Sequence, residues 1–300
     1  MTRVLVLGAT GNIGGLTAAT LQTHHPEVDL RLASSRDSGL EKLRDAFPGA
    51  EVVAADWYDV EKLTTALRGV DKVFMCTPDF YTDESVVTPN VIEAVRRAGT
   101  VKQIVRFIAI PDGLTADKLA PEFLATRCGA NMHVIAKPLL DASGLPVTYI
   151  NAPCWIMFNL PWFFADEIKN NDRLAMPASS NAARLWISEN DIADVAAKII
   201  ADPAADHVGK EYVVTGTERL DYRQVAALLK EVLGKSIDVV DDDTALRAAM
   251  GVNFDRLMTY FRHETRDYGV VKSTDTVSRL LGRPQVTLRD YVEANKAIFI

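Results

Sequence analysis

The feature that most limits what this chain can fold into is a glycine-rich turn near its start. An apolar run, Arg3–Leu7, leads into V-L-G-A-T-G-N-I-G at positions 6–14, and a helix is predicted over Asn12–Thr23. A strand, a glycine turn and a helix in this order are typical of a dinucleotide-binding fold. The glycines permit a tight turn, backbone approach to a pyrophosphate and close packing of helix on sheet. The helix N-terminus would hold the phosphate charge, and a turn without a ligand is the alternative.

Behind this turn, predicted strands and helices alternate along the first half of the chain. Strands are expected at 3–7, 29–33, 51–54, 72–75, 103–110 and 147–151, and helices at 12–23, 39–46, 60–68, 85–99 and 131–143. Strands separated by helices in this rhythm form right-handed crossovers and a parallel sheet. Later helices are expected at 188–201, 220–233, 243–250, 254–267 and 288–299, with a strand at 211–215.

The predicted fold class is therefore α/β. A Rossmann-type, doubly wound parallel sheet is expected in residues 1–152, and a smaller, mostly helical substrate-binding part in residues 153–300. Within the second part, residues 188–216 are expected to return to the first domain.

Composition excludes several other classes of protein. The 300 residues are 48% hydrophobic and 24% charged, which supports a packed core in one large or two interleaved domains. A net charge of −7 gives no support for nucleic-acid binding, and no apolar run is long enough to cross a membrane. Cys76, Cys128 and Cys154 match no disulfide or zinc pattern, and no metal site is predicted. We therefore expect a reduced, soluble, cytoplasmic protein.

The end of the second predicted strand indicates which nicotinamide cofactor fits the turn. NAD sites usually place an acidic residue here, and NADP sites a basic one. The sequence reads S-S-R-D at 34–37, so Ser35 and Arg36 are suited to hold a 2′-phosphate. NADP (NADPH) is the predicted cofactor. The alternative is an exposed Arg36 paired with Asp37.

Two further segments follow predicted strands on the same side of the sheet. Asp56 can accept a hydrogen bond from the adenine amine and Trp57 can pack on the base, although Trp57 also suits a core position. Thr77 and Pro78 follow the fourth strand, where backbone usually faces the cofactor ribose. The predicted cofactor-binding residues are Gly8, Thr10, Gly11, Asn12, Ile13, Gly14, Ser35, Arg36, Asp56, Trp57, Thr77, Pro78 and Lys137.

At these segments the chain resembles the NmrA-like group, the atypical branch of the short-chain dehydrogenases/reductases. The resemblance is carried by GATGNIG, Arg36, AADWYDVEKLTTALRGVDKVFMCTP, VIEAVRRAG and QIVRF, and later by LDASGLPVTYINAP, ISENDIADVAAKII and LGRPQVTLRDYVEANKAIF. It covers nearly the whole chain and is specific for fold and cofactor rather than for substrate. It implies a reductase like those of isoflavones, phenylcoumarans, quinones or triphenylmethane dyes, or a catalytically silent NADP-sensing regulator.

The usual catalytic tyrosine of short-chain dehydrogenases is missing from its expected helix. Two Tyr-x-x-x-Lys strings, Tyr58…Lys62 and Tyr268…Lys272, lie elsewhere and are rejected as chance matches. The resemblance instead aligns His133 with a Lys or His of the family's reductases, which makes His133 the candidate proton donor. Lys137, four residues further along the same helix, is the second catalytic candidate, because it could stabilise a developing oxyanion or contact the nicotinamide ribose. The alternatives are a packed or capping histidine and a surface lysine.

Two residues near this helix depart from the expected pattern. Pro138 disfavours a helical conformation at Lys137, so the helix is expected to kink or to restart there. Ala109 ends the fifth strand where relatives often have serine, so no hydroxyl is available from this position.

The segment N-A-P-C-W-I-M-F-N-L-P-W-F-F at 151–164 is rich in aromatic residues. It leads beyond the carboxyl ends of the strands, where ligands of open α/β sheets bind. The predicted substrate-binding residues are Trp155, Phe158, Asn159 and Trp162, and the alternative is that they form the core of the small domain. A second wall is expected from Tyr260, Phe261 or His263, and a lid from residues 111–130.

Three functions follow from these observations. The first is an NADPH-dependent reductase of a small apolar or aromatic carbonyl, enone or quinone, with a proton from His133 or solvent. The second is a non-catalytic NADP(H) sensor, which needs the glycine turn and Arg36 but not His133. An epimerase or lyase using bound NADP has no specific support. The expected partner is a small molecule, and the expected state is a monomer or homodimer.

Overall fold

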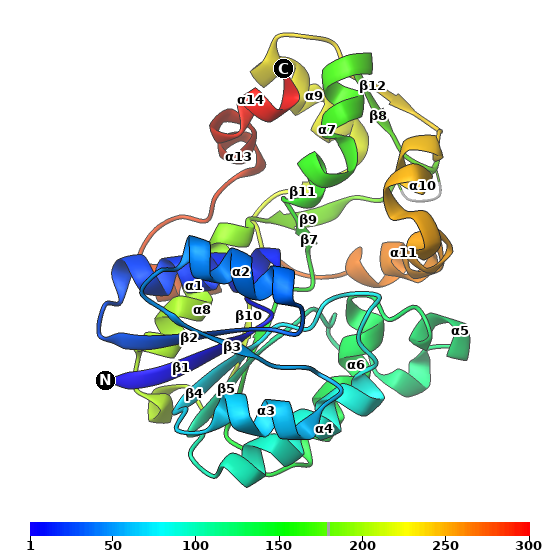
Figure 1. Cartoon of the computed structure of the whole chain (residues 1–300). Coiled ribbons are helices and arrows are strands. Elements are labelled where there is room, and N and C mark those ends of the chain that lie inside the picture. Colours follow the sequence, from blue (N-terminus) through cyan, green and yellow to red (C-terminus); the bar gives the residue numbers. More distant parts are fainter. Residues whose placement is uncertain (179–180) are drawn as a thin grey trace.

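A seven-stranded sheet dominates the computed structural model, which describes residues 1–178 and 181–300 and their side chains except those of 263 and 265–267. Every pair of neighbouring strands in this sheet is parallel. The strand order is β10-β6-β5-β4-β1-β2-β3, so the chain runs outward from β1 in both directions (Figure 1). The strands are β1 (Thr2–Leu7), β2 (Val28–Ser34), β3 (Glu51–Ala54), β4 (Lys72–Met75), β5 (Gln103–Ile108), β6 (Val147–Asn151) and β10 (Glu211–Val213). The predicted α/β class and doubly wound parallel sheet are confirmed.

Helices cover both faces of this sheet. One face packs against α1 (Asn12–His24), α2 (Asp37–Ala46), α8 (Glu189–Ala201) and α12 (Thr276–Leu281). The other packs against α3 (Val60–Leu67), α4 (Glu84–Ala98) and α6 (Ala130–Asp141). Each face has its own apolar core because side chains alternate along a strand: Val4 and Val6 belong to one core, and Leu5 and Leu7 to the other.

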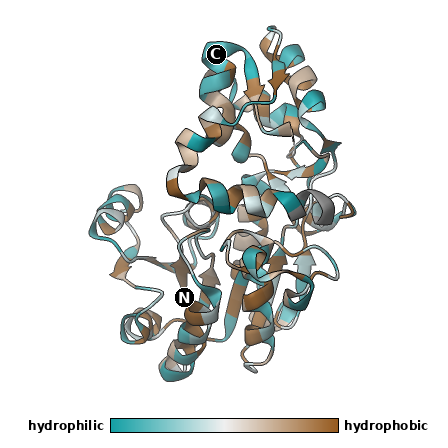
Figure 2. Cartoon of the chain, turned by 90° about the vertical axis from the view of Figure 1, so that its right-hand side faces the viewer, coloured by the Kyte–Doolittle hydropathy of each residue, from teal (hydrophilic) through white to brown (hydrophobic). Residues whose placement is uncertain are grey.

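A smaller part of the molecule gathers at the end away from the N-terminus (Figure 1). It contains the helices α7 (Asn159–Asn171), α9 (Tyr222–Leu233), α10 (Thr244–Met250), α11 (Phe254–Tyr268), α13 (Leu288–Ala294) and α14 (Lys296–Phe299). They share a third apolar core that is rich in aromatic residues, including Trp155, Phe163, Trp186 and Phe261. Figure 2 shows brown, apolar segments in the strands, while the surrounding helices alternate teal and brown.

Short strands in the smaller part were not predicted. A three-stranded sheet joins β7 (Trp155–Ile156), β9 (Arg184–Ile187) and β11 (Arg219–Leu220), and a two-stranded sheet joins β8 (Arg173–Ala175) and β12 (Asp238–Val240). Strands of two to four residues carry too little alternation to be recognised, and distant partners stabilise them. The segment expected as one helix at 288–299 is divided into α13 and α14 at Asn295.

The helix that carries His133 continues through Pro138. α6 runs as one helix from Ala130 to Asp141 and contains Pro138, so the expected restart does not occur, while the expected kink stays a prediction. Pro138 lies near the C-terminal end of α6, where its missing N–H costs one hydrogen bond. Burial of Val134 and Leu140 in the core between α6 and the sheet compensates for that loss.

The connection after β5 contains short helical turns rather than an irregular loop. These are the 3-10 turn Ala116–Lys118 and α5 (Pro121–Leu124). Leu119 and Cys128 are buried, which packs this segment against its neighbours. Further 3-10 turns lie at Ala204–Asp206 and Gly251–Asn253.

Candidate active site

One cavity of about 540 Å³ runs along the carboxyl ends of β1, β2, β4 and β5 and into the smaller part. The β1–α1 turn borders one end of this cavity, and aromatic residues of α7 and α11 border the other. Ligands of open α/β sheets bind at this edge, where the strand order reverses. The volume suits a small organic ligand.

Two glycines of the β1–α1 turn stand where a side chain would collide with backbone. A Cβ on Gly8, which has φ +93°, would lie 2.2 Å from the carbonyl oxygen of Cys76. A Cβ on Gly14 would lie 2.2 Å from the carbonyl oxygen of Gly8. Gly11 precedes α1, whose first turn has no side-chain cap and no acidic residue. The unpaired N–H groups of this turn are therefore fitted to an anion.

The other predicted residues of the turn, Thr10, Asn12 and Ile13, also line the cavity. The Oδ1 atom of Asn12 is buried and has no hydrogen-bond partner among the described residues. A buried amide oxygen without a partner is costly, so this atom is fitted to a donor group of a ligand.

At the end of β2, Ser35 and Arg36 are exposed and line the cavity. Ser34 shapes the turn, since its Oγ accepts a hydrogen bond from the backbone N–H of Arg36 at 3.2 Å. Within the described part of the chain no carboxylate pairs with the guanidinium of Arg36, so the alternative pairing with Asp37 is absent. Arg36 is therefore available to an anionic group beside β2.

Asp56 and Trp57 line the cavity after β3, and their contact with an adenine ring stays a prediction. The Oδ1 atom of Asp56 accepts from the backbone N–H of Tyr58 at 3.0 Å, which orders this short turn. Tyr58 links two loops: its hydroxyl donates to the carbonyl oxygen of Tyr81 at 3.0 Å and accepts from the N–H of Asp83 at 2.9 Å. The Tyr58 hydroxyl is thus engaged in holding the cavity rim.

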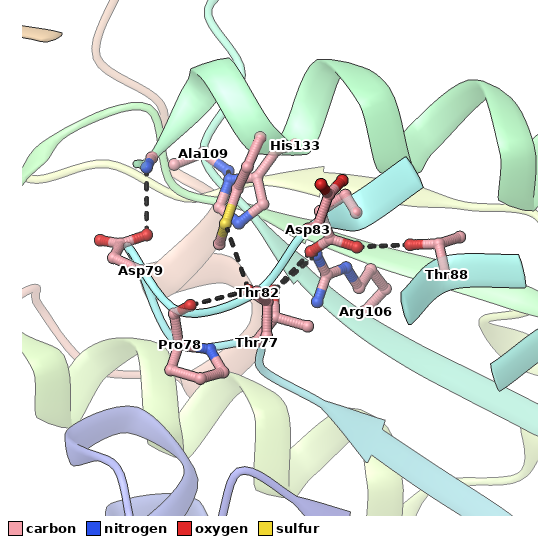
Figure 3. Close-up of polar contacts among 12 residues, drawn as sticks. Thr77, Pro78, Asp79, Thr82, Asp83, Thr88, Arg106, Ala109 and His133 are labelled. Carbon is pink, nitrogen blue, oxygen red and sulfur yellow. Dashed lines mark hydrogen bonds and ion pairs between the residues drawn. The ribbon is translucent and has the colours of Figure 1, made fainter. Parts of the chain in front are cut away.

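A buried polar cluster lies directly behind Thr77 and Pro78 (Figure 3). Arg106 and Glu84 are almost completely buried, and Nη2 of Arg106 lies 2.5 Å from Oε1 of Glu84. Thr77 Oγ1 donates to the same Glu84 oxygen at 2.6 Å and accepts from Arg106 Nη2 at 2.9 Å. This network fixes the strand ends where a nicotinamide ribose would pass.

His133 is buried in the cavity wall and is oriented by the backbone. The N–H of Ala109 donates to Nδ1 of His133 at 2.9 Å (Figure 3). Since an amide N–H can only donate, Nδ1 is an acceptor and the proton of the neutral ring lies on Nε2. Burial, together with the nearby positive charge of Arg106, holds the pKa of His133 well below its ordinary value. The imidazole is therefore neutral at neutral pH and offers one N–H donor.

Lys137 does not join His133 in the cavity. Its ammonium lies 2.9 Å from Asp141 and 3.6 Å from Glu211, and 4.5 Å from the centre of the Tyr149 ring. Lys137 is not among the described residues that line the cavity, although the i, i+4 spacing favoured a shared face. Two carboxylates and an aromatic ring hold this cation elsewhere, so it is left out of the site that we propose below.

The predicted aromatic wall is present, with one exception. Trp155 of β7 lines the cavity, and so do three residues of α7, Asn159, Trp162 and Phe163. The Trp162 and Phe163 rings stack with centres 4.6 Å apart. Phe158 is not among the described lining residues, because its ring stacks on Trp162 at 5.9 Å instead.

Helix α11 supplies the opposite wall through Leu257, Tyr260, Phe261 and Tyr268. Tyr260 and Phe261 were expected here, whereas the side chain of His263 lies outside the described residues. The hydroxyl of Tyr260 donates to the hydroxyl of Tyr268 at 2.9 Å, and Tyr268 donates to the carbonyl oxygen of Ala109 at 3.0 Å. We call Tyr260 and Tyr268 the hydroxyl pair.

The whole arrangement matches a known family. A family profile described as the NmrA-like family matches residues 1–278. The chain belongs to this family. A curated relative, the "NAD(P)H azoreductase" of Xenophilus azovorans, is 29% identical over 306 residues, which cover 99% of both chains.

Solved structures of similar fold include both reductases and a regulator. The NADP(H) complex of the Citrobacter sp. triphenylmethane reductase has a TM-score of 0.78 at 20% identity, covering 98% of this chain and 99% of the other. NmrA, titled a negative transcriptional regulator in complex with NADP, has a TM-score of 0.74 at 19% identity, covering 97% and 94%. At these identities the likeness establishes the fold of this NmrA-like protein. A second curated relative, the "Phenylcoumaran benzylic ether reductase TP7" of Nicotiana tabacum, is 25% identical over 245 residues, which cover 79% of this chain and 77% of the other, and both curated relatives are named as reductases.

Sequence reasoning missed three parts of the site. The Arg106–Glu84 pair was missed because each residue looks like an ordinary charged residue until the fold buries both. Asp79, whose Oδ1 accepts from the N–H of Gly129 at 3.1 Å, was also missed. Tyr268 was set aside with its Tyr-x-x-x-Lys string. Its i+8 spacing from Tyr260 on an amphipathic helix was the available signal.

Two further observations concern the described residues as a whole. None of their helices is both long and apolar enough to cross a membrane. Nor do they bring three or more His, Cys, Asp or Glu side chains together in a way that could hold a metal ion.

Proposed function

We propose that this NmrA-like protein is an NADPH-dependent reductase of a small, flat, apolar or aromatic carbonyl, enone or quinone. The observation that carries the proposal is the continuity of one cavity. It joins the glycine turn before α1 and Arg36, which pairs with no carboxylate among the described residues, to a wall of stacked aromatic rings, and His133 lines the same cavity. A cofactor at one end and an aromatic substrate at the other would meet at the ends of β4 and β5.

NADP is the cofactor that the β2 end favours. Ser35 and Arg36 lie exposed at the place where the adenosine ribose is bound in this fold, and Arg36 can hold a 2′-phosphate bidentately. The turn before α1 would hold the pyrophosphate, Asp56 and Trp57 the adenine, and Thr77 and Pro78 the nicotinamide ribose. When bound, the cofactor supplies the hydride.

The protein's own residues would bind, orient and enclose the substrate. Trp155, Phe163 and Phe261 offer flat apolar surfaces, which favour an aromatic substrate over a sugar. His133 can donate a hydrogen bond from Nε2 to a substrate oxygen or to the cofactor amide, since its ring is held neutral. The name of a curated relative, the "Phenylcoumaran benzylic ether reductase TP7", refers to an aromatic compound and supports a substrate of this class.

A second function, non-catalytic NADP(H) sensing, is favoured by a different observation. Ala109 follows β5 without a side-chain hydroxyl, and the His133 imidazole beside it is not charged at neutral pH. A sensor would need the turn and Arg36 alone, and a regulator is among the structural neighbours. We expect a monomer or homodimer in either case.

Turnover separates the two functions. The purified protein is mixed with NADPH and, in turn, with menadione, 9,10-phenanthrenequinone, an aromatic enone and methyl red, and NADPH oxidation is followed by its absorbance. We expect at least one quinone to be reduced. Tight NADPH binding without oxidation by any compound would refute the reductase and favour the sensor.

A further inference from the structure

We propose that the hydroxyl pair, Tyr260 and Tyr268, is the oxygen-recognition site of the substrate pocket. In this proposal Tyr268 turns its O–H from the carbonyl oxygen of Ala109 to an oxygen atom of a flat aromatic ligand. Tyr260 then stabilises the Tyr268 oxygen through the hydrogen bond that it already donates. Recognition of the ligand oxygen does not depend on the proposed reductase function, whereas the donation of a proton by Tyr268 rests on it.

The position of the pair within the cavity is the first argument. Both tyrosines line it, and the Tyr268 hydroxyl donates to the carbonyl oxygen of Ala109, the residue whose backbone N–H binds His133. One residue after the end of β5 thus contacts a phenol from α11 and an imidazole from α6 through its two backbone polar groups. Both side chains are nine-tenths or more buried, so the pair is surrounded by protein except toward the cavity.

The hydrogen-bond order gives the two hydroxyls different tasks. The Tyr260 proton points to Tyr268, so the Tyr268 oxygen is the one that receives stabilisation. Burial raises the pKa of both phenols well above the ordinary value, while the bond from Tyr260 opposes this rise at Tyr268. Both groups are therefore neutral donors at neutral pH, and Tyr268 is the better acid of the two.

The fold holds α11 firmly where the pair is needed. Glu264 lies one turn from each tyrosine on the same helix face and forms a buried ion pair with Arg184, with Nε to Oε1 at 2.8 Å. Gly129, with φ +49°, leaves the space that the Tyr260 hydroxyl occupies, since a Cβ there would lie 2.5 Å from that oxygen. A ligand oxygen would therefore meet hydroxyls that are already ordered.

During reduction the same pair would supply the proton. As hydride reaches the substrate carbon, the π electrons of the C=O bond move onto oxygen, and that oxygen takes the proton of Tyr268. The Tyr268 oxygen then takes the Tyr260 proton, and solvent entering the cavity restores Tyr260. This removes the need for a charged His133 and for a hydroxyl at Ala109.

The first test measures recognition without turnover. Dissociation constants of 2-naphthol and naphthalene are measured by calorimetry on the NADP⁺-loaded protein and on its variants. We expect 2-naphthol to bind about threefold to tenfold tighter than naphthalene, and Tyr268→Phe to abolish this preference. Tyr260→Phe should reduce it, which keeps the proposal testable if Tyr268→Phe fails to fold. Equal binding of both compounds, or an unchanged preference in Tyr268→Phe, would overturn the proposal.

Tyr222→Phe is the matched control. Tyr222 is a buried tyrosine of the smaller part, its hydroxyl has no hydrogen-bond partner among the described residues, and it does not line the cavity. This variant should keep the full preference for 2-naphthol. A loss equal to that in Tyr268→Phe would mean that removing any buried hydroxyl here loosens the pocket, and the proposal would fail.

The second test separates this inference from the proposed function. With menadione and NADPH, Tyr268→Phe should lower kcat by about a hundredfold while NADPH affinity stays unchanged. Menadione reduction with an unaltered kcat in Tyr268→Phe would overturn the proton step and leave the reductase intact. If 2-naphthol binds in a Tyr268-dependent way but no quinone is reduced, the reductase fails while oxygen recognition stands.

Discussion

The two ends of the cavity are built in different ways. The cofactor end uses one short stretch, residues 6–14, in which backbone collisions dictate glycine at Gly8 and Gly14. The substrate end combines β7, α7, the end of β5, α6 and α11, which are separated by as many as 159 residues at the Ala109–Tyr268 contact.

This difference decides what each end depends on. Local backbone geometry shapes the cofactor end, so a single methyl group should disturb it. Long-range contacts hold the substrate end, and the buried ion pair of Arg184 and Glu264 is one of them. The experiments below either sharpen this contrast or break it, and they run from the largest expected effect to the smallest.

Glu264→Gln should produce the largest loss of stability. It would remove the carboxylate charge that pairs with the buried Arg184 guanidinium, and we expect the free energy of unfolding to fall by about 3–5 kcal/mol. Urea denaturation followed by circular dichroism measures this change. Glu231→Gln, which breaks an exposed pair with Arg289, should cost at most about 1 kcal/mol. Equal losses would show that long-range charge pairing does not support the substrate end.

Gly8→Ala tests the cofactor end against a glycine of similar conformation. Gly8 and Gly144 have φ of +93° and +71°, but an added Cβ meets backbone only at Gly8. We expect Gly144→Ala to cost about 1–2 kcal/mol and Gly8→Ala about 2–4 kcal/mol, because the collision adds to the strain. NADPH affinity should fall tenfold or more in Gly8→Ala and stay unchanged in Gly144→Ala, because only at Gly8 does the collision act on the turn that binds the cofactor. Identical behaviour of the two variants would contradict the steric argument.

Arg36→Ala should change cofactor choice without changing stability. Loss of a charged hydrogen-bonding partner of the 2′-phosphate should weaken NADPH binding by about tenfold to a hundredfold and leave NADH binding nearly unchanged. Fluorescence titration with both cofactors measures the ratio. Arg44→Ala, on the exposed side of α2, should leave the ratio unchanged. An unmutated protein that binds both cofactors equally would defeat the assignment of Arg36.

His133→Asn should remove part of the pH dependence of stability. The pKa of His133 in the folded protein is lowered, so below about pH 6.5 the unfolded chain binds a proton that the folded protein does not. Stability from this group is therefore present above that pH and decreases as pH falls, by up to about 1.4 kcal/mol per pH unit. Asparagine can still accept from the Ala109 N–H. The difference between the two proteins, measured by urea denaturation from pH 7.5 to 5, isolates this effect, and parallel pH curves would refute it.

The sheet and the cofactor end could be predicted from the sequence because both depend on residues that are close together in the chain. Apolar runs, helix starts and the glycines of 6–14 are visible within short segments, and their predicted positions agree with β1, α1 and β2. The same reasoning expected Trp155, Asn159 and Trp162 in the crevice beyond the strands, and they line the cavity there, while substrate binding stays a prediction.

Several other outcomes depended on packing that no local pattern contains. Lys137 pairs with Asp141 on its own helix and also with Glu211, and Glu211 comes within reach only because β10 lies beside β6. Pro138 remains helical because the core between α6 and the sheet compensates for one lost hydrogen bond. The pKa of His133 is lowered first by burial and then by the positive charge of Arg106.

The sequence by itself therefore determined the fold class, the glycine turn and the basic residue at the end of β2. These features follow from steric limits and periodicity within short segments. Only the tertiary structure decided which polar groups meet at the far end of the cavity. Tyr268, rejected as part of a chance motif, lies there because α11 folds back across the sheet edge onto Ala109. Burial and distant neighbours determine the chemistry of such a side chain, and neither can be read from its own segment.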